Sequence, residues 1–533
     1  MEFLATLLVQ QPLLAVFLVI ALGYAIGAID LKGFSLGVGA VLFSGLAVGA
    51  LAPKAQPPAL VGTLGLVMFL YGLGVQFGRQ FFAGLASREG RRYNLLAGLA
   101  LLAAAVTTLA LQALLDTPHD LMAGIFAGSG TNAATMQAAM EAAGTNQPAI
   151  GYSVAFPFGL AGAILCMYVA QLVVKPDTER GLGSGLHTLE IVLRSPQVVG
   201  RTLGDIASHL PAGVSLLVVR VAGENRHPDP AYVLGDEDVL LLGGEDREVL
   251  ETAGATLGER AAGQVVFDRS AMDLVRVFVS RPAVAGTRVA DLQLPAGVAA
   301  TVTHVQRGDT EMLITPGLTF ELGDRVGLLA DRGAFASLRK HFGDSIRGTT
   351  EFSYVSLGVG MVLGVLLGTV AFPVPGLGTL KVGVAGGSLI AALILGKLGR
   401  TGPLTWTMPL SANLTLRNFG LSLFLAQVGM ASGAPFVDVV ANGGLVYLAA
   451  GAGILFALAL TPLLVGHYVM HIPFDDLLGV TAGITGTPAI LAYAYRRYPS
   501  ERVEVCYAMI YPATTIVKIV LAQILIALGR AGS

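Results

Sequence analysis

Two short polar stretches within apolar surroundings contain the residue types that could bind a small carboxylate. The first is Gly128-Ser129-Gly130-Thr131-Asn132, and the second is Thr485-Gly486-Thr487-Pro488. Glycine lets a backbone break and approach a ligand closely, and a helix that resumes after a break presents free N–H groups with partial positive charge. We therefore predict that both stretches bind substrate in a shared carboxylate cradle. The alternative is that they are glycine- and threonine-rich segments for helix packing.

Lys518 is the most deeply placed cation, because it lies in the middle of the predicted span 503–528. The run from 514 to 520 is otherwise uncharged. A cation inside a membrane span is costly unless it faces a partner or water, so it marks a functional position by default. We predict that Lys518 contacts a substrate carboxylate or tethers a neighbouring helix. Weaker candidates for substrate binding are Gln76, Arg79 and Arg417, although both arginines lie at expected span ends and suit cytoplasmic anchors better.

The candidate residues lie within a sequence repeat whose two copies are separated by a fixed offset of 355 residues. Gly65 recurs as Gly420 and Tyr152 recurs as Tyr507, in each case 355 residues later. Both copies of the repeat lie in apolar segments. Many secondary transporters are built from a duplicated set of spans, with the substrate held between the repeats. The repeat therefore predicts a carrier.

The composition is that of a membrane protein. The 533 residues are 54% hydrophobic and 13% charged, with a mean hydropathy of +0.71, and the net charge of −2 gives no reason to expect nucleic acid. A helix needs roughly 17–25 apolar residues to cross a bilayer. The predicted spans are 12–29, 34–52, 60–78, 94–115 and 150–174 in the first block, and 352–371, 381–398, 413–432, 443–466 and 503–528 in the second. The predicted re-entrant hairpins are 120–145 and 478–498.

Five spans in each block is an odd number, which predicts that the two blocks have inverted topology. Cytoplasmic loops of membrane proteins carry an excess of Lys and Arg. The loop 79–93 is basic, whereas the loops at 52–59, 116–120 and 433–442 contain only one cation. We therefore expect a multi-pass protein of the cytoplasmic (inner) membrane, with both termini outside and residues 175–350 in the cytoplasm.

Residues 175–350 are polar enough to be soluble and contain a repeat of their own. Leu234-Gly235-Asp236, for example, recurs as Leu322-Gly323-Asp324. Short β-branched runs alternate with Gly-Asp turns, as is typical of strands. We predict two small α/β domains at about 186–257 and 264–343.

The two soluble repeats resemble the C-terminal subdomain of potassium-conductance regulators, the RCK-C or TrkA-C domain. The resemblance rests on a P-x-V-x-G start at Pro196 and at Pro282, and on the L-G-D turn before a hydrophobic strand. Two such copies between two membrane blocks resemble the aspartate:alanine exchanger family over nearly the whole chain. Further segments that carry the resemblance are Phe69–Gly74, Arg417–Leu421, Gly483–Ala489 and Tyr511-Pro512. The family implies a secondary exchanger of small carboxylates, such as aspartate with alanine, or of dicarboxylates.

The chain departs from the family pattern at two places. The first polar stretch continues as Thr131-Asn132-Ala133-Ala134, where the family motif resembles T-x-T-P, whereas the second keeps that motif. Arg79 stands where a proline is usual after Gly78. Both departures lie near the expected site, so the resemblance does not specify the substrate.

Together these features predict an α-helical membrane protein with two inverted repeats, residues 1–174 and 352–533. Each repeat has about five transmembrane helices plus a re-entrant hairpin, and two small α/β cytoplasmic RCK-C-like domains are inserted between them. The predicted function is secondary active exchange of small carboxylates or amino acids by movement of a hairpin-containing transport domain. The alternative is an ion channel or cation transporter gated by the RCK-C-like domains.

The expected partners follow from this prediction. They are a small carboxylate or amino-acid substrate, the lipid bilayer, a second copy in a homodimer and a small cytosolic regulatory ligand, with no nucleic acid. The sequence contains no Walker or H-E-x-x-H motif, and such motifs would indicate nucleotide hydrolysis or metal-dependent enzymatic chemistry. No catalytic residue, metal ion or cofactor is therefore expected.

Overall fold

The computed structural model of the chain divides into two compact units, a helical unit (Met1–Arg180, Tyr354–Trp406 and Asn413–Ser533) and an α/β unit (Gly181–Ser353 and Thr407–Ala412). The residues that the structure describes are 2–29, 36–174, 187–194, 198–211, 213–222, 224–226, 228–244, 247–261, 272–281, 283–296, 298, 300–307, 310–314, 318–344, 353–374, 378–486, 490–491, 493–494 and 501–532.

The first half of the helical unit is a series of helices, some of which overlap the five predicted spans. They are α1 (Glu2–Gln10), α2 (Pro12–Gly27), the short 3₁₀ turn η1 (Gly37–Gly39), α3 (Ala40–Leu51), α4 (Ala59–Ala86), α5 (Arg88–Leu115), α6 (His119–Ser129), α7 (Ala133–Ala143) and α8 (Gln147–Val174). Local sequence explains several boundaries. Pro12 begins α2, where its missing N–H costs nothing, and the Ser87 hydroxyl caps α5 by accepting from Gly90 N at 3.0 Å.

The second half contains α12 (Tyr354–Gly368), α13 (Gly383–Leu398), α14 (Leu410–Leu464), a π-helical turn η5 (Val465–Val469), α15 (Phe474–Thr485) and α17 (Glu501–Gly532). Two short strand pairs interrupt it, β10 (Ala371–Val374) with β11 (Gly378–Lys381), and β12 (Arg400–Thr401) with β13 (Leu404–Thr405).

The prediction of separate spans at 413–432 and 443–466 with a loop between them is wrong, because α14 is one continuous helix. Its 55 residues correspond to about 80 Å of straight helix, more than twice the hydrocarbon thickness, so it must bend, and Pro435 inside it is a cause of bending. The first half breaks at the capping residue Ser87. Its counterpart Asn442 instead donates back to Asp438 O at 2.9 Å within the helix, which leaves no cap to start a new one.

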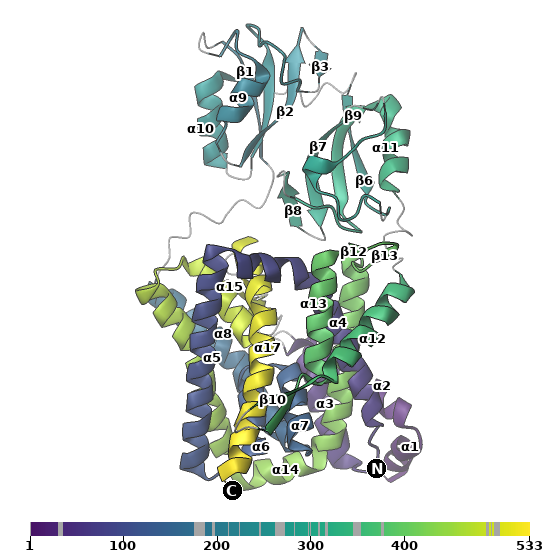
Figure 1. Ribbon diagram of the computed structural model, residues 1–533, viewed down its shortest axis with the longest axis vertical. Coiled ribbons are helices and arrows are strands. Elements are labelled where there is room, and N and C mark those ends of the chain that lie inside the picture. Colours follow the sequence, from purple (N-terminus) through teal and green to yellow (C-terminus); the bar gives the residue numbers. More distant parts are fainter. Residues whose placement is uncertain are drawn as a thin grey trace. The chain divides into compact units, whose positions relative to one another are not determined.

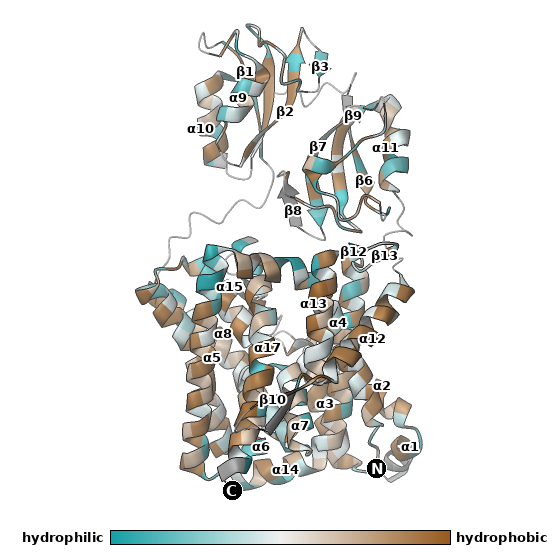
Figure 2. Cartoon of the chain, viewed as in Figure 1, coloured by the Kyte–Doolittle hydropathy of each residue, from teal (hydrophilic) through white to brown (hydrophobic). Residues whose placement is uncertain are grey.

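The exterior of the helical unit is apolar. Among the residues that the structure describes, five helices are long and apolar enough to cross a membrane, namely α4, α5, α8, α14 with its π turn, and α17. Four shorter apolar helices accompany them within the described residues. Figure 2 shows hydrophobic residues over most of this unit, and large side chains such as Leu60, Leu114 and Leu445 are 76–84% exposed. Such a surface is stable only against lipid.

Glycines bring α4 and α14 into close contact at a crossing where each helix contributes a glycine that packs on the other. A Cβ atom at Gly65 would lie 2.9 Å from Leu423 Cβ, and a Cβ atom at Gly420 would lie 2.9 Å from Met68 Cβ. Gly65 and Met68 are the repeat counterparts of Gly420 and Leu423, so the two contacts are equivalent. Only small residues let two backbones approach this closely in a membrane.

We expect Gly420→Leu to wedge α4 and α14 apart and to lower the free energy of unfolding by about 1–3 kcal/mol, the usual cost of overpacking. Gly358→Leu on α12 is the matched control, because no atom lies within 4 Å of a Cβ atom there. Denaturant unfolding of both variants in detergent micelles is the measurement. Equal stability of the two variants would contradict the packing role of Gly420.

The repeat also extends to the packing of the broken helices. A Cβ atom at Gly128 would lie 3.0 Å from Ala155 Cβ, and a Cβ atom at its counterpart Gly483 would lie 3.1 Å from Ile510 Cβ, again 355 residues later. The α6 helix therefore packs on α8 in the same manner as α15 packs on α17.

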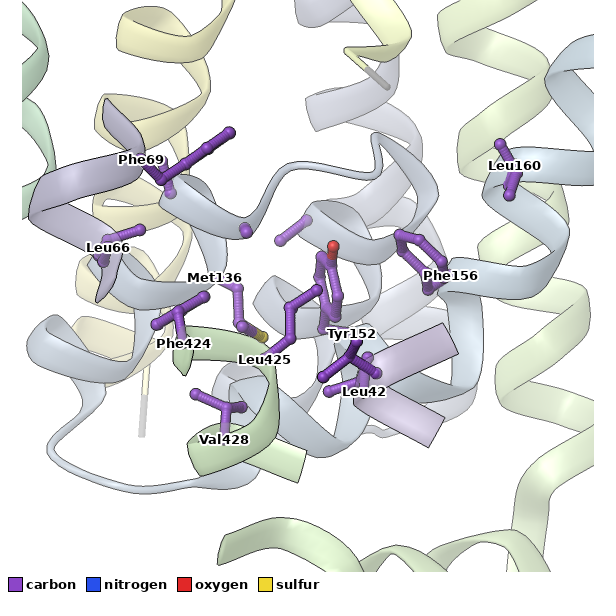
Figure 3. Close-up of a cluster of buried hydrophobic side chains, with 14 of the residues drawn as sticks. Leu42, Leu66, Phe69, Met136, Tyr152, Phe156, Leu160, Phe424, Leu425 and Val428 are labelled. Atoms are coloured by element: carbon purple, nitrogen blue, oxygen red, sulfur yellow. The ribbon is translucent and has the colours of Figure 1, made fainter. Parts of the chain in front are cut away.

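The helices of this unit form two groups (Figure 1). In the α4 group, α2, α3, α4, α12, α13 and the first part of α14 pack together. In the α17 group, α17 packs with α5, α6, α7 and α15, while α8 packs on α6 and α7. Figure 3 shows that the two groups share one apolar cluster, in which Leu66 and Phe424 belong to the α4 group and Met136, Tyr152 and Phe156 to the α17 group.

A buried carboxylate ties three helices of the α17 group together. Asp476 in the first turn of α15 is 1% exposed, and its carboxylate accepts from Arg502 Nε at 2.7 Å, from Arg502 Nη2, and from the Tyr93 hydroxyl at 2.6 Å. The three side chains come from α15, α17 and α5, so this cluster holds the N-terminal end of α15 against the other two helices.

We expect Asp476→Ala to destabilise the protein by about 2–3 kcal/mol. This is less than the roughly 3–5 kcal/mol of a fully buried pair, because the Arg502 side chain is 54% exposed and can turn toward solvent. Asp475→Ala is the control, since Asp475 lies farther from Arg502, at 3.5 Å. Thermal unfolding in detergent should rank Asp476→Ala below Asp475→Ala, and the reverse order would exclude this role.

The α/β unit contains two antiparallel sheets. The first has the order β3-β2-β4-β1-β5 and consists of β1 (His187–Val192), β2 (Val214–Val221), β3 (Glu224–Arg226), β4 (Val239–Gly244) and β5 (Glu259–Ala261), with α9 (Leu203–His209) and α10 (Arg247–Leu257). The second has the order β6-β9-β7-β8 and consists of β6 (Met272–Phe278), β7 (Ala300–Arg307), β8 (Thr310–Leu313) and β9 (Arg325–Asp331), with the 3₁₀ turns η3 (Val289–Asp291) and η4 (Arg332–Ala334) and helix α11 (Phe335–Phe342).

The soluble repeat found in the sequence is visible in the backbone of both sheets. The register shifts between Leu216 and Val218 in β2 and between Val302 and His304 in β7, 86 residues later. A β-bulge at the same place in two copies is a shared design feature. The second copy adds an ion pair, because Asp324 accepts from Arg307 Nε and Nη2 at 2.7 Å each. Burial opposes the charge on Arg307, but Asp324 and Glu321 together raise its pKa above the ordinary value.

Candidate functional site

The two predicted polar stretches are helix ends that meet inside the helical unit. The α6 helix ends at Ser129, the chain turns at Gly130–Asn132, and α7 begins at Ala133; α15 ends at Thr485, followed by Gly486. The Thr131 hydroxyl donates to Thr485 O at 2.6 Å. Every described residue of the two stretches is buried. The structure thus brings together two segments more than 350 residues apart.

We call the turn Gly130–Asn132 the first tip and the end of α15 at Thr485–Gly486 the second tip. The first tip is held in a strained backbone conformation. Thr131 has φ +43°, and its counterpart Gly486 has φ +92°. Glycine adopts such angles freely, whereas a β-branched residue pays roughly 1–2 kcal/mol. The hydrogen bond to Thr485 and the neighbouring cap compensate for this strain, and strain of this kind is concentrated at functional sites.

In the first tip, which lacks the Thr-Pro of the family motif, the side chain of Asn132 begins the next helix. Its side-chain oxygen caps α7 by accepting from Thr135 N at 2.9 Å. Its amide nitrogen donates to the Thr515 hydroxyl at 3.0 Å. One residue thereby begins α7 and ties the first tip to α17.

Lys518 lies between the two tips. Its side chain is 1% exposed, and Nζ donates to Gly130 O at 3.0 Å and to Ile484 O at 2.5 Å. These carbonyls are at the C-terminal ends of α6 and α15, where the helix dipole places partial negative charge that favours a cation. The repeat counterpart of Lys518 is Ala163, which is uncharged. The first half therefore has no cation equivalent to Lys518. Among the described residues, no carboxylate is within ion-pair distance of Nζ.

Arg417 is buried, so the interpretation of it as an anchor at the membrane surface is wrong. It is 7% exposed, and its Nη1 donates to Gln76 Oε1 on α4. A Cβ atom at Gly72 would lie 2.6 Å from Arg417 Cγ, so the absence of a side chain at Gly72 makes room for the arginine stem. Arg417 is buried because α14 crosses α4 here, which its position near the end of a span does not reveal.

A row of aromatic rings leads from Arg417 to the second tip. The guanidinium carbon of Arg417 lies 5.7 Å from the Phe77 ring centre, and the Phe77 ring lies 5.8 Å from that of Tyr507. Tyr507 stacks on Tyr511 at 5.1 Å, and a Cβ atom at Gly486 would lie 3.1 Å from Tyr511 Cε2. Sequence reasoning missed both tyrosines as site residues, although the recurrence of Tyr152 as Tyr507 was a signal for one.

The remaining predicted residues have other contacts. Arg79 is half-buried, and its Nη2 would lie 2.7 Å from a Cβ atom at Gly399, at the end of α13. Ser129 donates to Gly451 O at 2.9 Å, which joins the first tip to α14. Thr487 and Pro488 lie outside the described residues. In the part of the chain that the structure describes, no group of three or more metal-ligating side chains occurs.

Comparisons with known proteins identify the family of the chain. A family model described as "Predicted Permease Membrane Region", of the aspartate:alanine exchanger type, matches residues 15–172 and 356–527, and the TrkA-C domain matches residues 274–343. A solved RCK domain is similar at 12% identity over 34% of this chain and 70% of its own, but its TM-score of 0.16 is too low to carry an argument.

Relatives that match nearly the whole chain are also transporters. An uncharacterised transporter of Geobacter sulfurreducens is 39% identical over 98% of this chain and 99% of its own length. Uncharacterised transporters of Symbiobacterium thermophilum and Corynebacterium diphtheriae are 37% and 34% identical, each over 97% of this chain and 98% of their own. The chain therefore belongs to the aspartate:alanine exchanger family of transporters and is a multi-pass membrane protein with a TrkA-C domain.

Proposed function

We propose that this protein is a secondary exchanger of small carboxylates or amino acids in the cytoplasmic membrane. The observation that carries the proposal is the meeting of two broken helices, one from each half, around the buried cation Lys518. Backbone that breaks at membrane depth is tolerated only where protein or water surrounds it. In transporters, such broken helices lie at the substrate site between repeats.

Inverted repeats are part of the proposal, and the α4–α14 crossing supports them. Side chains pack on two glycines there, Gln427 on Gly62 and Arg417 on Gly72. Gln427 is the repeat counterpart of Gly72, and Arg417 is the counterpart of Gly62. The contacts therefore run in opposite directions along the two helices and exchange under a two-fold rotation. An axis perpendicular to two spanning helices lies in the membrane plane, which is the symmetry of inverted repeats.

In the proposed mechanism the α17 group, which contains both tips, moves past the α4 group as a body. Contacts between them include apolar ones, such as the one in which a Cβ atom at Gly84 would lie 2.9 Å from Met509 Cγ, and a hydrogen bond from Gln523 Nε2 on α17 to Lys381 O before α13. Smooth apolar surfaces can slide without breaking ion pairs. The substrate would lie between the tips and the aromatic row, and its movement with the α17 group would expose it to each side in turn.

The proposed orientation places both termini outside and residues 175–350 in the cytoplasm. The basic loop 79–93 supports it through the positive-inside rule. Figure 1 also marks both chain ends at one end of the helical unit, as an even number of spans requires. For the RCK-C-like domains we propose either binding of a small cytosolic ligand that regulates transport, or dimerisation.

Counterflow in proteoliposomes tests the proposal. Vesicles are loaded with unlabelled aspartate, alanine, glutamate or succinate in turn, and uptake of each labelled compound is followed. We expect internal substrate to accelerate uptake of at least one compound over protein-free vesicles. No acceleration by any of the four would overturn the exchanger proposal, and a conductance carried by inorganic ions in the same vesicles would favour a channel.

A further inference from the structure

We infer that Arg417 and Tyr507 form the subsite that binds the carboxylate of the transported compound. This inference rests on the proposed function and names the residues that recognise the anion. It assigns a binding role to a position next to the tips, on the boundary between the two helix groups.

Arg417 carries a buried charge that the described residues do not compensate. Its one hydrogen bond goes to the neutral amide of Gln76, and its Nε is buried without a hydrogen-bond partner among the described residues. No described carboxylate lies within ion-pair distance of the guanidinium. A buried, unpaired cation is strongly unfavourable, and a planar guanidinium is suited to grip a carboxylate with two parallel hydrogen bonds. A bound anion would satisfy both the charge and the free donor.

Tyr507 offers a second donor near the arginine. Its side chain is 2% exposed, and its hydroxyl, too, is buried without a partner among the described residues. The Phe77 ring contacts both residues: the Tyr507 ring packs against it, and the Arg417 guanidinium lies over it. Two unpaired donors around one aromatic ring, in the same buried region, point to one missing acceptor rather than to two separate defects, because buried polar groups are normally paired.

The unpaired side-chain oxygen of Asn413 indicates which group of the ligand lies beside the carboxylate. Its Nδ2 donates to Gly72 O at 3.0 Å, which fixes the orientation of the amide, and its Oδ1 is buried without a partner in the described part of the chain. Both Asn413 and Arg417 pack on Gly72. An acceptor one turn from the arginine fits a ligand with a hydrogen-bond donor next to its carboxylate, such as an ammonium group.

The position of this subsite couples binding to movement. Arg417 belongs to the α4 group, whereas Tyr507 belongs to the α17 group. A carboxylate held by both would join the two groups while bound and release them when it leaves. The counterpart of Arg417 in the first half is Gly62, on which the neutral Gln427 packs, so the subsite exists on one side of the repeat axis.

The test compares Arg417→Met, Arg417→Lys and Tyr507→Phe with Gln427→Met, the matched control at the equivalent glycine contact. Counterflow and ligand-induced thermal shift are measured with L-aspartate, L-alanine and succinate. We expect Arg417→Met to lose at least about 30-fold in kcat/KM, the effect of leaving a charged group unpaired, and Tyr507→Phe to lose about 10-fold. Gln427→Met should stay within about threefold of the unmodified protein, close to the error of such comparisons.

The readouts separate a binding role from a structural one. Ligand-free Arg417→Met should melt at or above the temperature of the unmodified protein, because an uncompensated charge has been removed, and Arg417→Lys should retain weak binding. If exchange by Arg417→Met equals that of the control, the inference fails and the proposed function stands. If Arg417→Met does not fold, unaltered KM in Arg417→Lys and Tyr507→Phe overturns the inference.

Failure of the proposed function gives a different pattern. The unmodified protein would then show no counterflow, and thermal shift alone would report on the subsite. A shift by any of the three compounds that Arg417→Met or Tyr507→Phe abolishes would support the subsite without transport. The absence of any shift in the unmodified protein would overturn both.

Discussion

We expect Lys518→Met to reduce counterflow at least about 100-fold, because the bridge between the two tips is lost. The ammonium group donates to Gly130 O and Ile484 O, and methionine leaves both carbonyls buried without this donor. Each orphaned group costs about 1–3 kcal/mol, so the tips should separate or rearrange. Proteoliposome counterflow and unfolding in detergent, measured on the same preparation, are the two readouts.

Gln523→Met is the control for this substitution. Gln523 lies on the same helix, is 8% exposed, and donates to one carbonyl, that of Lys381, at 2.9 Å. The variant should lose some stability but keep exchange, since no hydrogen bond between Lys381 and either tip occurs among the described residues. If Lys518→Met exchanges substrate as fast as Gln523→Met, Lys518 does not position the tips for transport.

A disulfide between the two helix groups should stop exchange completely and reversibly. The proposed pair is Gly84→Cys on α4 with Met509→Cys on α17, in a protein without Cys166 and Cys506. A Cβ atom at Gly84 would lie 3.0 Å from Met509 Cβ, slightly closer than the roughly 3.5–4.5 Å of a disulfide. Oxidation should fix the α17 group to the α4 group, and reduction should restore counterflow.

A second disulfide within the α17 group provides the matched control. A Cβ atom at Gly479 on α15 would lie 2.8 Å from Cβ of the native Cys506 on α17, so Gly479→Cys supplies a pair of similar geometry. Its oxidation should leave the exchange rate unchanged, because both residues move together. Undiminished counterflow in the oxidised Gly84–Met509 pair would rule out relative movement of the two groups.

Much of the local structure follows from the sequence. Apolar runs of sufficient length predict helices at α4, α5, α8 and α17, because helix formation and membrane burial depend on consecutive residues. The glycine- and hydroxyl-rich stretch at 128–132 predicts a break, and the chain does break at Gly130–Asn132. The fixed offset of 355 predicts equivalent packing, which the pairs Gly128–Ala155 and Gly483–Ile510 show.

The continuity of α14 was not predictable in the same way. Asn442 occupies the position of the cap Ser87, and asparagine is itself a good N-cap. Its side chain donates to the preceding turn instead, so the helix continues. The choice between the two arrangements depends on the tertiary path of the chain, which composition does not contain.

The sequence by itself determined the class of protein, the repeat, the α/β insertion and the chain break at 128–132, since each can be recognised from residue types and their order without knowledge of the packing. Only the tertiary structure decided the partners of the polar residues. Lys518 meets carbonyls 388 and 34 residues away, and Arg417 meets Gln76 at a separation of 341 residues. Whether a cation near a span end is solvated or buried depends on which helix crosses it, and that crossing is set by the packing of glycines on both helices.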